Sequence, residues 1–168
     1  MANYNLSTRG RIADITRGMI VSTATLNATA ACVSTPKSLF TVYGLIRVMM
    51  LEMEIITVMG ADATTIQFSF DPSTPAIAAV AISAASGSVA NLEQGHTVML
   101  SGTALNTGPL VSAEACVGLS NNAWMQLGCT GGVGAITSTG GTADATSGTV
   151  KFHLAYVPIT EGAYAVAT

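Results

Sequence analysis

Strict alternation of apolar and polar residues in two segments constrains the fold of this chain more than any other feature. In residues 64–71 every second side chain is large and apolar, namely Ile66, Phe68 and Phe70. Residues 150–157 repeat the pattern with Val150, Phe152, Leu154 and Tyr156. Residues two apart share one face of a β-strand, so both segments predict strands with one buried face.

Apolar and β-branched runs predict further strands, the strongest of them at residues 38–59. They fall at residues 19–26, 38–59, 97–101, 109–118, 123–128 and 163–167. Within 38–59, Glu52 and Glu54 alternate with apolar neighbours; a helix would put them on different faces, so a strand is preferred. Gly44 is expected to bend or bulge that strand.

Two segments have no alternation that would assign them to strands. The alanine-rich run 76–85 stays open between a short helix begun by Pro75 and a packed strand. Residues 131–148 are rich in Gly, Thr and Ser, and their glycine clusters are interpreted as turns. They resemble phosphate-binding loops only superficially, because a phosphate loop follows a strand and opens a helix.

The predicted fold is all-β, an antiparallel β-sandwich or jelly-roll-like domain with an extended N-terminal arm. A chain of 168 residues fits one domain, which we place at 18–168. Residues 1–17 form the predicted arm, because they show no period and hold three of the four arginines, Arg9, Arg11 and Arg17. These arginines are the candidate interface residues, since a guanidinium pairs bidentately with carboxylates of a neighbour.

Low charge is the main compositional signal. Charged residues make up 9% of the chain, against about 25% in a typical soluble domain. Much of the surface is therefore expected to be hidden in an assembly or covered by small uncharged side chains. The net charge of −3 is spread along the chain, which argues against nucleic-acid binding.

Charged residues also interrupt the apolar stretches before they could span a bilayer, so no membrane segment is predicted. The N-terminus has no pattern of a secretory signal, and synthesis in a cytoplasm is expected. Cys32, Cys116 and Cys129 are interpreted as buried small hydrophobic residues.

The sequence contains few candidate residues for catalysis or ligand binding. His96 and His153 lack ligand spacing, so no metal and no other cofactor is expected. Glu52 and Glu54 share one strand face, as paired carboxylates of a hydrolase would; we prefer an outer face where they oppose Arg or Lys across a strand. Trp124 is the only candidate sugar platform, although a core or interface position is favoured. The sequence predicts no enzyme and no small-molecule substrate.

Several short motifs resemble a group of small tailed-bacteriophage structural proteins. They are Gly-Leu-Ile-Arg-Val at 44–48, the segment 60–68 closing on Asp71-Pro72, and 150–159 followed by Gly-Ala-Tyr-Ala-Val at 162–166. The resemblance covers residues 40–168.

This resemblance implies a capsid decoration (cement) protein on the surface of the virion. Its partners would be the major capsid protein and further copies of itself, as a homotrimer with the arm reaching a neighbour. Alternatives are a head-fibre, tail or tail-tip subunit, a carbohydrate- or receptor-binding module that uses Trp124 or Tyr164, and a small hydrolase that uses Glu52 and Glu54.

Overall fold

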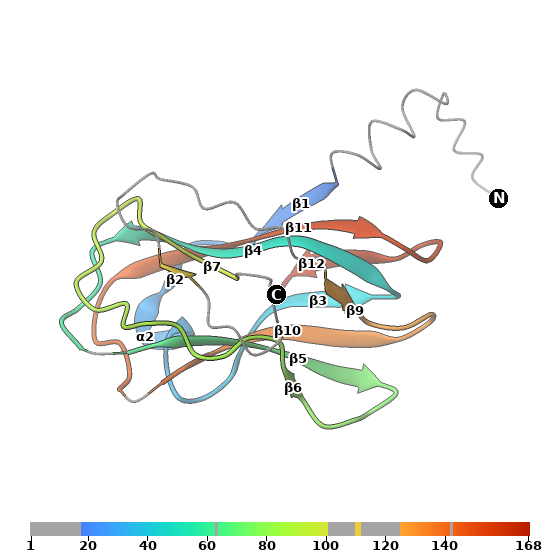
Figure 1. Cartoon of the computed structure of the whole chain (residues 1–168), viewed down its shortest axis with the longest axis horizontal. Coiled ribbons are helices and arrows are strands. Elements are labelled where there is room, and N and C mark those ends of the chain that lie inside the picture. The colour runs from blue at the N-terminus through green and yellow to red at the C-terminus, as the bar shows by residue number, and fades with distance from the viewer. Residues whose placement is uncertain (1–17, 63, 101–109, 112–124, 142) are drawn as a thin grey trace.

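The computed structural model describes residues 18–62, 64–100, 110–111, 125–141 and 143–168. This part of the chain is an antiparallel β-sandwich (Figure 1). One layer contains β1, β11, β4 and β7, and the other contains β3, β10, β5 and β6. The predicted all-β sandwich is confirmed.

The elements follow one another closely along the chain. Their bounds are β1 Met19–Ser22, β2 Leu26–Asn27, α2 Ala28–Ala31, β3 Lys37–Tyr43, β4 Ile46–Thr57, β5 Ile66–Thr74, β6 Val80–Ala81, β7 Thr97–Met99, β8 Leu110–Val111, β9 Met125–Leu127, β10 Val133–Gly140, β11 Thr149–Pro158 and β12 Tyr164–Ala167.

Both sheets are built from antiparallel pairs. The seven-stranded sheet has the order β1-β11-β4-β7-β8, with β2 also paired to β11 and β9 to β4. The five-stranded sheet has the order β12-β3-β10-β5-β6. The long central pair of the first sheet is β4 with β11, and it sets the register of the outer face described below.

Gly44 marks the point where the chain changes sheets. The predicted strand block 38–59 divides here, because β3 lies in the five-stranded sheet and β4 in the seven-stranded sheet. Gly44 has φ +73, a conformation that residues with a side chain rarely adopt. The predicted bend at this glycine is therefore confirmed, and it separates two layers.

Large apolar side chains from both sheets fill the space between the layers. Phe68 of β5 and Phe152 of β11 meet edge to face, with ring centroids 6.3 Å apart. The alternating positions predicted to be buried are all buried: Ile66, Phe68, Phe70, Val150, Phe152, Leu154 and Tyr156. Each such side chain contributes about 1.5–3 kcal/mol on burial, so these two strands anchor the core.

The interpretation of the glycine clusters as turns holds at Gly131 and is wrong at Gly134 and Gly140. Residues 133–140 form β10, the central strand of the five-stranded sheet. A Cβ on Gly134 would lie 2.5 Å from the Phe70 ring, and one on Gly140 would lie 2.7 Å from the backbone of Cys32 and Val33. These glycines permit close packing within a strand, and their density conceals the strand in the sequence.

The alanine-rich run forms an edge and contains no described helix. Val80 and Ala81 pair with β5 as the two-residue strand β6, and Ala76 forms an isolated bridge with Ser73 of β5. Ile82 is buried but Val80 is 55% exposed, so the packing that the strand alternative expected for both residues is found only at Ile82. The helix alternative is wrong.

Candidate functional site

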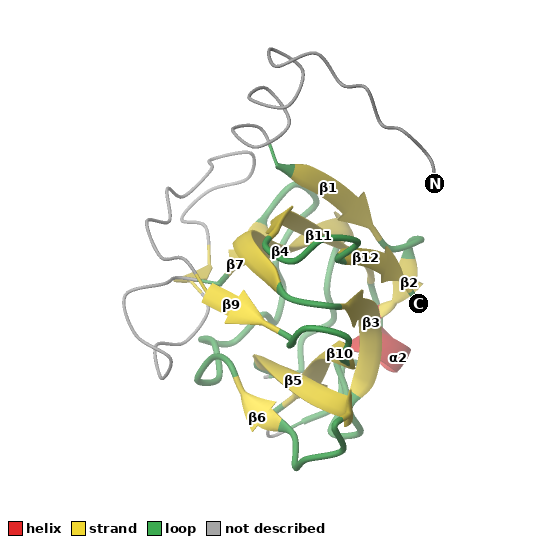
Figure 2. Cartoon of the chain, turned by 90° about the vertical axis from the view of Figure 1, so that its right-hand side faces the viewer, coloured by secondary structure: helices red, strands yellow, loops and turns green. Residues whose placement is uncertain are grey.

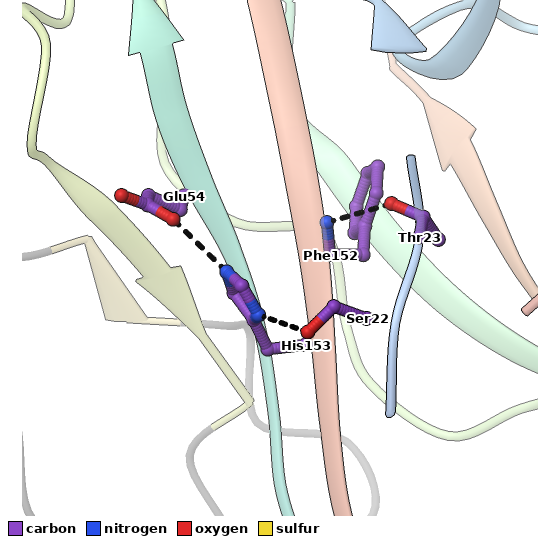
Figure 3. Close-up of polar contacts among 5 residues, drawn as sticks. All are labelled: Ser22, Thr23, Glu54, Phe152 and His153. Carbon is purple, nitrogen blue, oxygen red and sulfur yellow. Dashed lines mark hydrogen bonds and ion pairs between the residues drawn. The ribbon is translucent and has the colours of Figure 1, made fainter. Parts of the chain in front are cut away.

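A row of polar side chains crosses three strands on the outer face of the seven-stranded sheet (Figure 3). The Ser22 hydroxyl of β1 lies 2.7 Å from Nδ1 of His153 on β11. The other ring nitrogen, Nε2, lies 2.9 Å from Oε2 of Glu54 on β4. Ser22, His153 and Glu54 are called the polar row below.

Strand alternation and register assemble the polar row. Phe152 and Leu154 of β11 point into the core, so His153 between them points outward. Antiparallel pairing places Ser22 opposite His153 on one side and Glu52 opposite it on the other. Glu54, two residues along β4, reaches the imidazole diagonally.

The preferred interpretation of the two glutamates is confirmed for their shared outer face and, at Glu54, for the opposing base. Glu54 is directly opposite Lys151, whereas Glu52 is opposite His153 and not an Arg or Lys. Burial raises the pKa of the Glu52 carboxyl; the neighbouring His153 opposes that rise, and Glu54 adds to it. The outer face of the sheet is partly covered at this point. The His153 side chain on β11 is 18% exposed, and the Glu54 side chain on β4 is 40% exposed.

The polar row has the residue types of a nucleophile, a base and an orienting carboxylate. Acyl transfer also requires backbone or side-chain donors aimed at the developing oxyanion. The amide of Thr23, the residue after the serine, donates to the Phe152 carbonyl at 3.0 Å. The Thr23 hydroxyl in turn accepts from the Phe152 amide at 3.1 Å (Figure 3). The Thr23 amide is therefore used within the sheet and is not available to an oxyanion. The polar row links β1, β11 and β4 through side-chain hydrogen bonds.

A hollow of about 290 Å³ opens elsewhere, at the end of the sandwich near the turn after β5. Its walls are mostly apolar and include Phe70, Ile77, Leu127 and Val133. Cys129 also lines it and is exposed, so the prediction that this cysteine is buried is wrong.

Cys32 shows the opposite behaviour. It is buried, as predicted, and burial raises the pKa of its thiol to about 12. A thiol with such a pKa is protonated at neutral pH and is a poor nucleophile. Cys116 lies outside the described residues.

Two tyrosines form a surface pair on the five-stranded sheet. Tyr43 of β3 and Tyr164 of β12 are opposite each other, and their rings stack with centroids 4.6 Å apart. Tyr164 is 44% exposed. The pair was not predicted, because nothing in the sequence sets the register of β3 against β12.

The other predicted site residues are not brought together by the described structure. Arg9, Arg11, Arg17 and Trp124 lie outside the described residues. His96 follows the turn at Gly95. Within the described ranges, no group of three or more His, Cys, Asp or Glu could hold a metal ion. The same residues include no helix with the length and apolarity to cross a bilayer.

Comparisons of the chain with protein-family models, with curated proteins and with solved structures find no match.

Proposed function

We propose that the chain is a non-enzymatic virion structural protein, a capsid decoration (cement) protein that binds the major capsid protein lattice and stabilises the phage head. It would act on the capsid surface, through protein contacts alone, with no cofactor, small-molecule substrate, nucleic acid or membrane. The motifs that resemble tailed-phage structural proteins suggest the particle, and the surface of the sandwich supports an associative role.

The observation that carries the proposal is exposed apolar surface on two neighbouring edge strands. The edge patch consists of Met19 and Ile20 on β1 and Tyr164 and Val166 on β12, each at least 40% exposed. β1 and β12 lie side by side although they belong to different sheets (Figure 2). Grouped apolar side chains that face water mark surfaces that bind other proteins.

The outer face of the five-stranded sheet supports the same role. Register places Thr41 and Asp71 on either side of Ala135, and Ser69 beside Thr137, so these positions across β3, β10 and β5 hold small side chains and one carboxylate. The small side chains lose little conformational entropy when a second surface covers them. A flat, weakly charged face suits many shallow contacts repeated by symmetry.

The polar row is consistent with a non-enzymatic role, since its neighbouring amide is used within the sheet. The arm residues Arg9, Arg11 and Arg17 are proposed as contacts to carboxylates of an adjacent subunit.

Binding to capsid shells tests the proposal. Purified chain is mixed with shells of the same virus and sedimented, and we expect saturation at a fixed ratio to the major capsid protein. Val166→Lys should weaken binding at least tenfold, whereas Val58→Lys, at a valine that is 57% exposed away from the edge patch, should bind like the parent. Failure of the parent to sediment with shells would contradict the proposal. Equal loss in both variants would contradict the role of the edge patch.

A carbohydrate- or receptor-binding module is the second candidate, favoured by the stacked Tyr43–Tyr164 pair, because sugars bind to exposed aromatic rings. A glycan-array screen with Tyr164→Ala as the control checks it. Selective binding that is lost in the variant would support this role over capsid decoration.

A further inference from the structure

The edges of this sandwich differ in whether their main-chain groups are satisfied. On β12, the Ala165 amide donates to the Tyr156 hydroxyl at 3.0 Å. Tyr156 reaches this edge from β11 of the other sheet, and its hydroxyl donates to the Ala165 carbonyl, with 3.5 Å between the two oxygens. A buried phenol therefore closes the middle of the β12 edge.

Side chains close the edge of β5 in a similar way where β6 ends. The Phe68 amide donates to Ser83 Oγ, and the Ile66 amide donates to Ser86 Oγ, both at 2.9 Å. The backbone amides of the same serines donate back to the carbonyls of Phe68 and Ile66. This edge has no main-chain groups left for another strand along 66–68.

β1 is different. It is the terminal strand of the seven-stranded sheet among the strands described. The Thr23 amide bonds to Phe152, and antiparallel hydrogen bonds alternate along a strand. The main-chain groups of Ile20 and Ser22 consequently point away from β11. Residues 18–26 contain no charge and no proline, the features that usually protect an edge from pairing.

We propose that β1 pairs antiparallel with β1 of a second copy of this chain, across a two-fold axis beside Val21. Ile20 of each copy then faces Ser22 of the other, which forms about four main-chain hydrogen bonds. The Ile20 side chain, 70% exposed in the single chain, becomes covered at the junction.

The properties of the β1 edge indicate a second copy of this chain as its binding partner. The groups on β1 require an extended, uncharged strand, and β1 is such a strand in every copy. An antiparallel edge is self-complementary across a two-fold axis, so the contact closes at two copies. This assembly differs from the three copies that the phage resemblance implies, and it rests on the β1 edge and not on capsid binding.

Proline at position 20 tests the pairing selectively. The Ile20 amide points outward, so Ile20→Pro removes a donor from the edge and none from the β1–β11 ladder. Ala167→Pro makes the matched change on β12, whose alternation also turns the amide of residue 167 outward.

Sedimentation velocity from about 1 to about 100 μM gives the readout. We expect the parent and Ala167→Pro to sediment at twice the chain mass of 17.0 kDa, and Ile20→Pro to dissociate at least tenfold more readily. A parent that is monomeric or trimeric throughout, or an Ile20→Pro variant as dimeric as the parent, would overturn the inference.

Cross-linking decides the matter if Ile20→Pro does not fold. In the proposed register Val21 of one copy is opposite Val21 of the other, at a Cα separation of about 4.5 Å that a disulfide can span. Val21→Cys should form a reducible covalent dimer under mild oxidation. The parent, which has the exposed Cys129, and Val166→Cys should not. Equal cross-linking in all three would overturn the inference.

Discussion

Phe152 and His153 are adjacent on β11, but they face different surroundings. Phe152 is fully buried between the sheets and packs against Phe68, whereas His153 lies on the outer face with Ser22 and Glu54. The inner face is specified by shape and volume, and the outer face by a few polar contacts. The comparison indicates that the fold depends mainly on the inner face of this strand.

Truncation of a side chain on the inner face should have the largest effect on the free energy of unfolding. Phe152→Ala removes a buried ring and leaves a cavity between the layers, so we expect a loss of about 3–5 kcal/mol in the free energy of unfolding. Urea denaturation measures it. Val157→Ala, at a half-buried position of the same strand, is the control and should cost about 1 kcal/mol. Similar losses in the two variants would remove the distinction between the faces.

Loss of the Tyr156 hydroxyl, which closes the β12 edge, should have the second largest effect on the free energy of unfolding. Tyr156→Phe keeps the ring but leaves the Ala165 amide without its partner, which should cost about 1–3 kcal/mol. Tyr164→Phe, at an exposed tyrosine, should leave the free energy of unfolding nearly unchanged. Thermal denaturation compares them, and a neutral Tyr156→Phe would show that water satisfies this edge equally well.

The polar row should contribute less to the free energy of unfolding than Phe152 or Tyr156. His153→Gln and Ser22→Ala each remove a partly exposed contact, so a change of about 1 kcal/mol or less is expected. Chemical denaturation at neutral pH is the measurement. A loss as large as that of Phe152→Ala would mean that the outer face also determines the fold.

Substitution of Glu52 should have the smallest effect on stability, and the size of this effect should depend on pH. Because burial raises the pKa of this carboxyl, the folded chain holds a proton that the unfolded chain releases. Stability from this site is complete below the ordinary glutamate pKa of about 4.3 and is lost as pH rises through the raised value. Glu52→Gln stays neutral, so its stability relative to the parent should increase as pH rises above the ordinary glutamate pKa of about 4.3. Denaturation at several pH values checks the sign; a constant difference would contradict the assigned cause.

The parts of the fold that could be predicted are the strands with one buried and one exposed face. Period two in β5 and β11 follows directly from that geometry. β10 could not be found in the same way, because Gly134 and Gly140 are selected by close contacts with Phe70 and with the backbone near Cys32. Those contacts exist only after the sheets have assembled.

The candidate site was predictable only within single strands. The shared face of Glu52 and Glu54 follows from their spacing, and so does the outward direction of His153. Ser22 is 131 positions from His153, and only the register of β1 against β11 brings them together. No signal in the sequence specifies that register.

The copy number of this chain in purified virions tests the central claim most directly. Quantitative mass spectrometry of particles, with the major capsid protein as the internal reference, gives the ratio. A decoration protein should be present at a fixed ratio close to one chain, or a simple fraction of one, for each capsid subunit. Absence from virions, or only a few copies in each particle, would contradict a role on the capsid lattice.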